Sequence, residues 1–65
     1  MGDTYESLSA MLGSATWASG KNDEGENVLV NRGDGYICTE TMQANGWTRM
    51  NYYHSDGTVE ETFSR

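Results

Sequence analysis

Apolar residues in the first part of the chain recur at helical spacing. Four of them in the segment 3–12 would share one stripe of a helix, namely Tyr5, Leu8, Met11 and Leu12. Asp3 and Glu6 stand three residues apart, as in a capping box, and Gly13 follows the stripe as a helix terminator. We therefore expect a short amphipathic helix over about residues 3–12, which is too short to be stable unless it docks on another element.

Beyond the helix, the pattern changes to apolar runs separated by turn residues. Three dipeptides typical of hairpin turns are Asp34-Gly35, Asn45-Gly46 and Asp56-Gly57. The strand-like runs around them are 28–32, 36–44, 47–54 and 58–63. Upstream, we expect a short strand over 14–19 and a polar acidic loop over 20–27. The sequence thus predicts an α+β fold in a single domain, residues 1–65, with an N-terminal helix packed on a four- to five-stranded antiparallel meander.

Two-residue turns at these dipeptides would set the register of the meander. The expected cross-strand pairs then include Val30 with Thr39, Cys38 with Tyr53 and His54 with Val59. The side expected beneath the helix carries Val28, Val30, Ile37, Thr39, Thr41, Met50, Tyr52, Val59 and Phe63. The other side carries Leu29, Tyr36, Cys38, Met42, Trp47 and Tyr53, interleaved with Asn31, Glu40, Arg49, Asn51, Glu60 and Thr62. A three-residue turn with a bulge would exchange the two sides of a strand.

One helix of this length covers only one side of such a sheet. The other side would expose aromatic and methionine side chains among polar ones, a composition typical of protein-binding surfaces. A change of register alters which residues belong to the exposed side, and it still leaves one side uncovered.

Charge narrows the choice of partners. The chain has 65 residues, of which 10 are acidic and 4 are basic, so its formal net charge is −6. The four basic residues are scattered, whereas nucleic-acid binding requires clustered cations. No apolar run approaches the roughly 20 residues of a membrane span. We expect no direct contact with nucleic acid or membrane, and a preference for basic protein surfaces.

The core is thin for a chain of this length. Only eight residues are Leu, Ile, Val or Phe, and the lone Cys38 rules out an internal disulfide. A thin core favours stabilisation by a second copy, so we expect a homodimer. The single cysteine, together with the polar start Met1-Gly2-Asp3, favours a reducing, cytoplasmic location.

Candidate catalytic and metal-binding residues do not form a constellation in the sequence. His54 adjoins Ser55 and Asp56, but turn chemistry explains these two residues and neighbours in a tight turn enclose no substrate. Cys38 lacks a second cysteine or a basic neighbour, and a buried or interfacial role fits it better. The acids near Gly25 do not have the spacing of a calcium loop. The tripeptide 32–34 reads Arg-Gly-Asp, which hairpin geometry explains. We expect no catalytic site, metal or cofactor.

These observations favour a non-enzymatic function. We expect a small acidic protein-binding module that acts as a decoy or inhibitor of a basic, nucleic-acid-handling protein, as mobile elements and viruses encode. The alternatives are a structural subunit of a homo-oligomer and a small-ligand-binding module that uses exposed aromatic residues. The residues expected to bind the partner are Trp47, Tyr53, Tyr36, Met42, Glu40, Asp23, Glu24 and Glu26.

Overall fold

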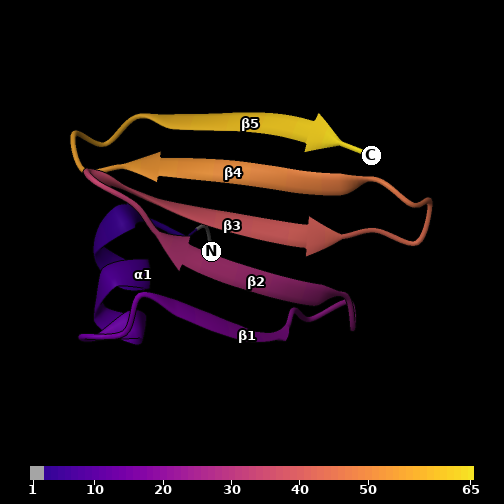
Figure 1. Cartoon of the computed structure of the whole chain (residues 1–65), viewed down its shortest axis with the longest axis horizontal. Coiled ribbons are helices and arrows are strands. Elements are labelled where there is room, and N and C mark those ends of the chain that lie inside the picture. Colours follow the sequence, from indigo (N-terminus) through magenta and orange to yellow (C-terminus); the bar gives the residue numbers. More distant parts are fainter. Residues whose placement is uncertain (1–2) are drawn as a thin grey trace.

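The computed structural model describes residues 3–65, which form one helix and one five-stranded antiparallel sheet (Figure 1). The strands follow one another in the order β1-β2-β3-β4-β5, so the expected α+β meander is confirmed. Met1 and Gly2, part of the polar start noted above, lie outside the described residues. The elements are α1 (Tyr5–Leu12), β1 (Trp17–Lys21), β2 (Asn27–Arg32), β3 (Tyr36–Met42), β4 (Thr48–His54) and β5 (Val59–Ser64).

The first strand lies slightly later in the chain than expected, at Trp17–Lys21, and the acidic loop is correspondingly shorter. Asn22 closes this loop, because its side-chain oxygen accepts hydrogen bonds of 3.0 Å from the backbone amides of both Glu24 and Glu26. Gly25 adopts a φ of 81°, a conformation that glycine tolerates and other residues rarely adopt. Local side-chain bonding therefore makes a tight turn of a segment that composition alone marks as an open loop.

The helix is capped one residue later than the sequence indicates. Thr4 is the N-cap, with its side chain accepting from the Ser7 amide at 3.0 Å, and the Ser7 hydroxyl accepts in return from the Thr4 amide at 2.9 Å. The expected capping pair of Asp3 and Glu6 is wrong. The hydroxyl groups of Thr4 and Ser7, one residue further along the chain, bond the free backbone amides at the start of the helix instead. Gly13 ends the helix, and its amide donates to Ser9 O at 3.0 Å.

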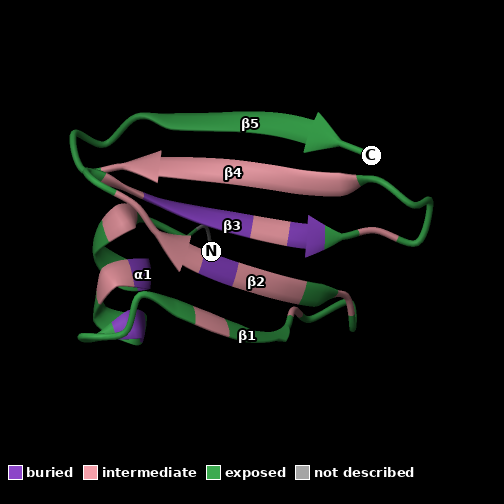
Figure 2. Cartoon of the chain, viewed as in Figure 1, coloured by how far each residue is buried: buried purple, intermediate pink, exposed green. Residues whose placement is uncertain are grey.

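The core lies between α1 and one end of the sheet (Figure 2). Its buried members are Leu8, Leu12, Val30 and Ile37, with Tyr5, Ala18, Val28 and Tyr53 packed around them. Met11, expected on the buried stripe, is instead 58% exposed. Met11 lines an open hollow between α1 and the sheet.

Arg32 holds the end of the helix against β2. Its guanidinium donates to Gly13 O at 2.8 Å and to Ser9 Oγ at 3.2 Å, and its Nε donates to Ala15 O at 3.4 Å. The last turn of a helix leaves carbonyl groups without partners and carries partial negative charge, and both effects favour a guanidinium there.

The turns between strands decide which residues share a face. The Asp34-Gly35 turn has two residues, and Val30 faces Thr39 as expected. The next two turns have three residues each, closed by bonds of 2.9 Å from Gln43 N to Trp47 O and from His54 N to Thr58 O. Each ends in a glycine of positive φ, as in a bulged hairpin, with 89° at Gly46 and 93° at Gly57. The expected register of both hairpins is therefore wrong by one residue.

This shift exchanges the two sides of β4. Cys38 faces Tyr52 instead of Tyr53, and Tyr53 faces both Ile37 and, across the next hairpin, Val59. Tyr53 thus lies on the helix-bearing face, while Tyr52 lies on the opposite, helix-free face. Strand β5 keeps its expected sides, because the second shift reverses the first.

Candidate functional site

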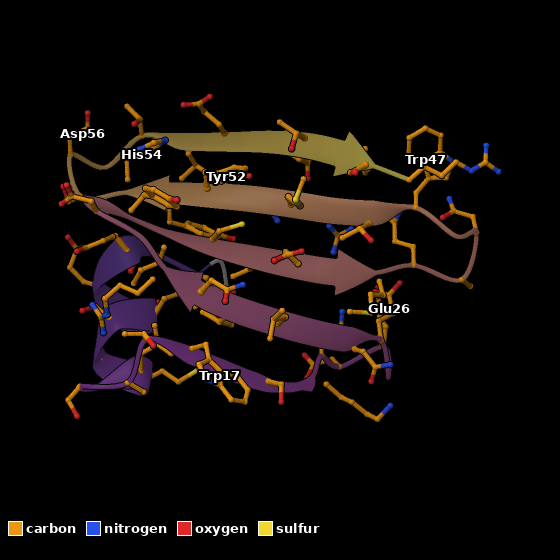
Figure 3. The ribbon with its side chains drawn as sticks, viewed as in Figure 1. Trp17, Glu26, Trp47, Tyr52, His54 and Asp56 are labelled. Carbon is orange, nitrogen blue, oxygen red and sulfur yellow. The ribbon has the colours of Figure 1, made fainter. Side chains whose placement is uncertain are left out.

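Aromatic rings cluster on the helix-free face at the end of the sheet where β3 begins and β4 ends. The ring centre of Tyr36 lies 5.7 Å from that of Tyr52 and 6.1 Å from that of His54 (Figure 3). Cys38, between these strands, is only 6% exposed even though the helix lies on the other face. The Tyr52 hydroxyl also lies 4.0 Å from Met50 Sδ. These side chains shield one another, so this face has its own shallow apolar layer.

Polar side chains on the helix-free face are largely paired with each other. Asn31 Nδ2 donates to Glu40 Oε2 at 3.0 Å, and His54 Nε2 lies 3.0 Å from Glu60 Oε1. Burial raises the pKa of the Cys38 thiol, and the nearby Glu40 carboxylate adds to the effect. The thiol is therefore neutral near pH 7, which is unsuited to nucleophilic catalysis.

The other face is open where α1 does not reach. The side chains there come from β4, β5 and the residue before β4, and we call this surface the β4–β5 face. Alternation and the observed register place on it Trp47, Arg49, Asn51, Tyr53, Val59, Glu61 and Phe63. Val59 is 56% exposed, Phe63 53% and Trp47 37%. All six residues of β5 are exposed, as the green strand in Figure 2 shows.

Charged groups interleave with the apolar residues of the β4–β5 face. The guanidinium of Arg65 lies over the Trp47 ring, 5.3 Å from its centre. Burial raises the pKa of the Tyr53 phenol, and the carboxylates of Asp3 and Glu61 act in the same direction, whereas Arg49 opposes them. Aromatic rings beside arginine and acidic groups are typical of surfaces that bind proteins.

A hollow of about 450 Å³ adjoins this face, between α1 and the sheet. Met11 and Val28 form part of its apolar wall, and Thr41, Arg49 and Asn51 bring polar groups to it. Its volume is large enough for one or two side chains of a partner. The β4–β5 face and the hollow share Arg49, Asn51 and Tyr53, so together they form one continuous open tract beside the helix.

The acidic loop lies at the end of the sheet that also holds Trp47, as the positions of Glu26 and Trp47 in Figure 3 show. The side chain of Asn22 donates to Glu26 Oε1 at 2.9 Å, and this bond holds the pKa of Glu26 below its usual range. Glu24 and Glu26 line a shallow depression together with Met42, which is 50% exposed. Two acidic residues of the loop, Glu24 and Glu26, thus lie beside the apolar side chain of Met42, although Met42 is distant from them in the sequence.

The structure divides the expected partner-binding residues among three places. Asp23, Glu24, Glu26 and Met42 lie at the loop end of the sheet, whereas Tyr36 and Glu40 lie on the helix-free face. Trp47 and Tyr53 were expected on the helix-free side. Alternation along β4 puts both on the helix-bearing face, because the bulged turn at Gly46 shifts the register.

Two residues of the β4–β5 face were expected from the sequence pattern to lie in the core. Val59 and Phe63 were expected beneath the helix, and they do lie on that face, but α1 does not extend over them. The short predicted length of the helix was the signal that could have identified them as exposed. A ten-residue helix is about 15 Å long, which spans roughly three strands.

The turn after β4 holds the Asp56 side chain in local hydrogen bonds. The Asp56 carboxylate accepts from the Thr58 amide at 2.9 Å and from the Thr58 hydroxyl at 2.7 Å, and these bonds lower the pKa of Asp56. Within residues 3–65, no three histidine, cysteine, aspartate or glutamate side chains lie close enough to bind a metal. Within the same range, α1 is too short to cross a membrane.

Comparison with models of known protein families, with characterised proteins and with solved structures finds no match to this chain.

Proposed function

We propose that the chain is a non-enzymatic protein-binding module whose β4–β5 face docks on a basic protein surface. The observation that carries the proposal is the exposure of Val59, Phe63 and Trp47 on one open tract. A surface of this kind is costly to leave in water unless a partner covers it. The adjoining hollow offers a pocket for an anchoring side chain.

Charge supports a basic partner. The net charge of −6 steers the chain towards positive surfaces, and four acids lie near the tract or at its ends, namely Glu61, Asp23, Glu24 and Glu26. Two of the four basic side chains are occupied within the chain, since Arg32 binds the helix end and Lys21 Nζ donates to Asn27 Oδ1 at 3.1 Å. The other two, Arg49 and Arg65, lie on the β4–β5 face itself, so the attraction to a basic partner comes from the net charge of −6 and from the acids at the ends of the tract.

The partner class we propose is a nucleic-acid-handling protein. Such proteins carry the clustered lysine and arginine residues that a carboxylate-rich surface complements, because the same clusters bind phosphates. A small acidic module on such a cluster would exclude nucleic acid and act as a decoy or inhibitor, of the kind encoded by mobile elements and viruses. We place this action in a reducing cytoplasm, where the single thiol of Cys38 stays unpaired.

Affinity capture with competition tests this function. The immobilised chain is incubated with nuclease-treated lysate, eluted with a salt gradient, and compared with the Trp47→Ser/Phe63→Ser variant. We expect a basic nucleic-acid-binding protein that elutes with salt, is lost with the variant and is displaced by its own nucleic acid. A captured protein that binds its nucleic acid and this chain simultaneously would contradict the decoy function.

Self-assembly is the second candidate, and the two edges of the sheet favour it. Strand β1 and strand β5 are both open to pairing, and they carry opposite charge, with Lys21 on β1 and Glu60 and Glu61 on β5. Pairing of β1 with β5 of a second copy would make a structural homo-oligomer. A melting temperature that rises with protein concentration, and a mass of two chains or more, would support this candidate.

A further inference from the structure

The free hydrogen-bonding groups of β5 can be assigned residue by residue. His54 N donates to Thr58 O, and in an antiparallel ladder such bonded pairs recur at every second residue. Thr58, Glu60, Thr62 and Ser64 therefore direct their backbone groups towards β4. The amides and carbonyls of Val59, Glu61 and Phe63 point away from the sheet.

The same three residues carry their side chains on the β4–β5 face, where Val59 and Phe63 are each more than half exposed. An added strand would thus gain three residues of backbone pairing and two apolar contacts from one set of positions. Glu61 lies between these contacts, and Glu60 points to the helix-free face. The edge offers an apolar-acidic-apolar row on one face and a second carboxylate on the other.

The charge on β5 identifies the kind of strand that fits it. Natural edge strands commonly avoid pairing through lysine, proline or bulges. The span Val59–Ser64 contains no lysine and no proline, and it pairs with β4 without a bulge. Its only charged residues are two glutamates. A second copy of β5 paired about a two-fold axis would set Glu61 opposite Glu61, which like-charge repulsion disfavours. A basic strand gains from both carboxylates.

We propose that the open edge of β5 is a strand-addition site for a basic extended segment of the partner. Antiparallel addition gives the segment the order apolar, any residue, basic, basic, apolar, opposite Phe63, Thr62, Glu61, Glu60 and Val59 in turn. The inference rests on the proposed function and specifies how the partner is held. The other edge is less suited to this segment, because β1 carries Lys21.

Hydrogen exchange with a designed peptide tests this assignment on the whole chain. The probe is a blocked heptapeptide of sequence TVTKKVT, and the controls are TVTEEVT, which reverses its charge, and TVTPKVT, which loses the backbone donor opposite Glu61. With TVTKKVT we expect the amides of Val59, Glu61 and Phe63 to exchange about tenfold more slowly. The amides of Glu60 and Thr62, already bonded to β4, should change much less. Neither control peptide should produce this alternating pattern.

A pair of variants with equal charge change separates local pairing from general attraction. Glu60→Gln/Glu61→Gln should weaken binding of TVTKKVT about 2- to 30-fold, as expected for two opposite-charge cross-strand pairs. Asp23→Asn/Glu24→Gln removes the same charge at the distant loop and should have a smaller effect. Circular dichroism should show both variants folded, because these side chains are exposed.

Several results would overturn the strand-addition site. They are protection on β1 instead of β5, protection of the β5 amides before any peptide is added, equal weakening by the two variants, and absence of protection at saturating peptide. A partner captured through the β4–β5 face without protection of Val59, Glu61 and Phe63 would leave the proposed function standing and remove this mode of binding. Protection of these amides by the peptide, without any captured partner, would leave the strand-addition site standing and remove the proposed function.

Discussion

The ring of Tyr36 lies against the backbone of Gly33, its cross-strand neighbour at the end of the β2–β3 hairpin. A methyl group added at Gly33 would collide with Cζ and Cε2 of that ring. Glycine is therefore required here for close approach of an aromatic side chain, and its φ is not positive. The position of the ring matters because Tyr36 and Tyr52 shield Cys38 on the helix-free face.

Gly33→Ala should displace the Tyr36 ring and expose the Cys38 thiol. We expect the free energy of unfolding to fall by about 1 kcal/mol and the alkylation of Cys38 by iodoacetamide to become faster. Gly20→Ala is the control, because a methyl group at Gly20, in β1, meets no atom within 4 Å. Equal alkylation rates in both variants would show that the ring does not shield the thiol.

Asp56 should make the stability of the β4–β5 turn depend on pH. Hydrogen bonds from Thr58 lower the pKa of Asp56 below its ordinary value of 3.8. A group with a lowered pKa stabilises the fold fully above its unfolded pKa, and this contribution is lost as pH falls through the folded pKa. Asp56→Asn should therefore melt at a lower temperature than the original chain at pH 7, and the difference should close below pH 3.8.

A pH series of thermal melts, followed by circular dichroism, measures this difference. Asp34→Asn in the β2–β3 turn is the control, because the Asp34 carboxylate accepts no such bond among residues 3–65. A difference between Asp56→Asn and the original chain that stays constant down to pH 2 would contradict the role of the carboxylate charge.

At the scale of elements, the turn dipeptides predicted where the hairpins lie and the register of the β2–β3 hairpin, but not the register of the next two. Asn45 Oδ1 accepts from Trp47 N at 2.9 Å, and Asp56 Oδ1 accepts from Thr58 N at the same distance. These local bonds accompany the three-residue turns. In the two-residue turn, the Asp34 carboxylate accepts no equivalent bond from any of the described residues, 3–65. The dipeptide is of the same type in each case, so composition could not reveal the bulges that exchange the sides of β4.

The stability of the fold should depend on which residue replaces Gly46. Its φ of 89° lies in a region that L-residues avoid, so Gly46→Ala should lower the free energy of unfolding by about 1–2 kcal/mol. Gly46→Asn should cost less, because asparagine tolerates left-handed conformations better. Urea denaturation of both variants measures the difference, and equal losses would argue against backbone strain as the cause.

The helix depends on Arg32 for its attachment as well as on its two buried leucines. Arg32→Gln removes charged donors from Gly13 O and Ser9 Oγ and should lower the free energy of unfolding by about 1–2 kcal/mol. Arg49→Gln removes the same charge from a side chain with no hydrogen bond to residues 3–65, and it should have little effect. Urea titrations that give equal losses for both variants would assign the effect to net charge.

For the whole molecule, the sequence predicted one uncovered side of the sheet, the helix-free side, but not the second open tract that α1 leaves on its own face. The meander, the helix and the excess of acids follow from periodicity, turn residues and composition. The location of the tract depends on how far a helix of two turns extends over five strands, which is a tertiary property. Trp47 and Tyr53 changed sides through one bulged turn, and Phe63 stayed exposed because the helix ends before reaching it.

The central claim is that the β4–β5 face binds a partner and is not part of the folding core. The most direct test measures stability and binding on the same sample of Trp47→Ser/Phe63→Ser. We predict that the free energy of unfolding changes by less than about 1 kcal/mol, as for exposed sites, while affinity for the captured partner falls tenfold or more, as expected from about 2 kcal/mol for an anchoring aromatic residue. A loss of about 3 kcal/mol or more in stability, typical of core aromatic residues, or unchanged binding by the folded variant, would contradict the claim.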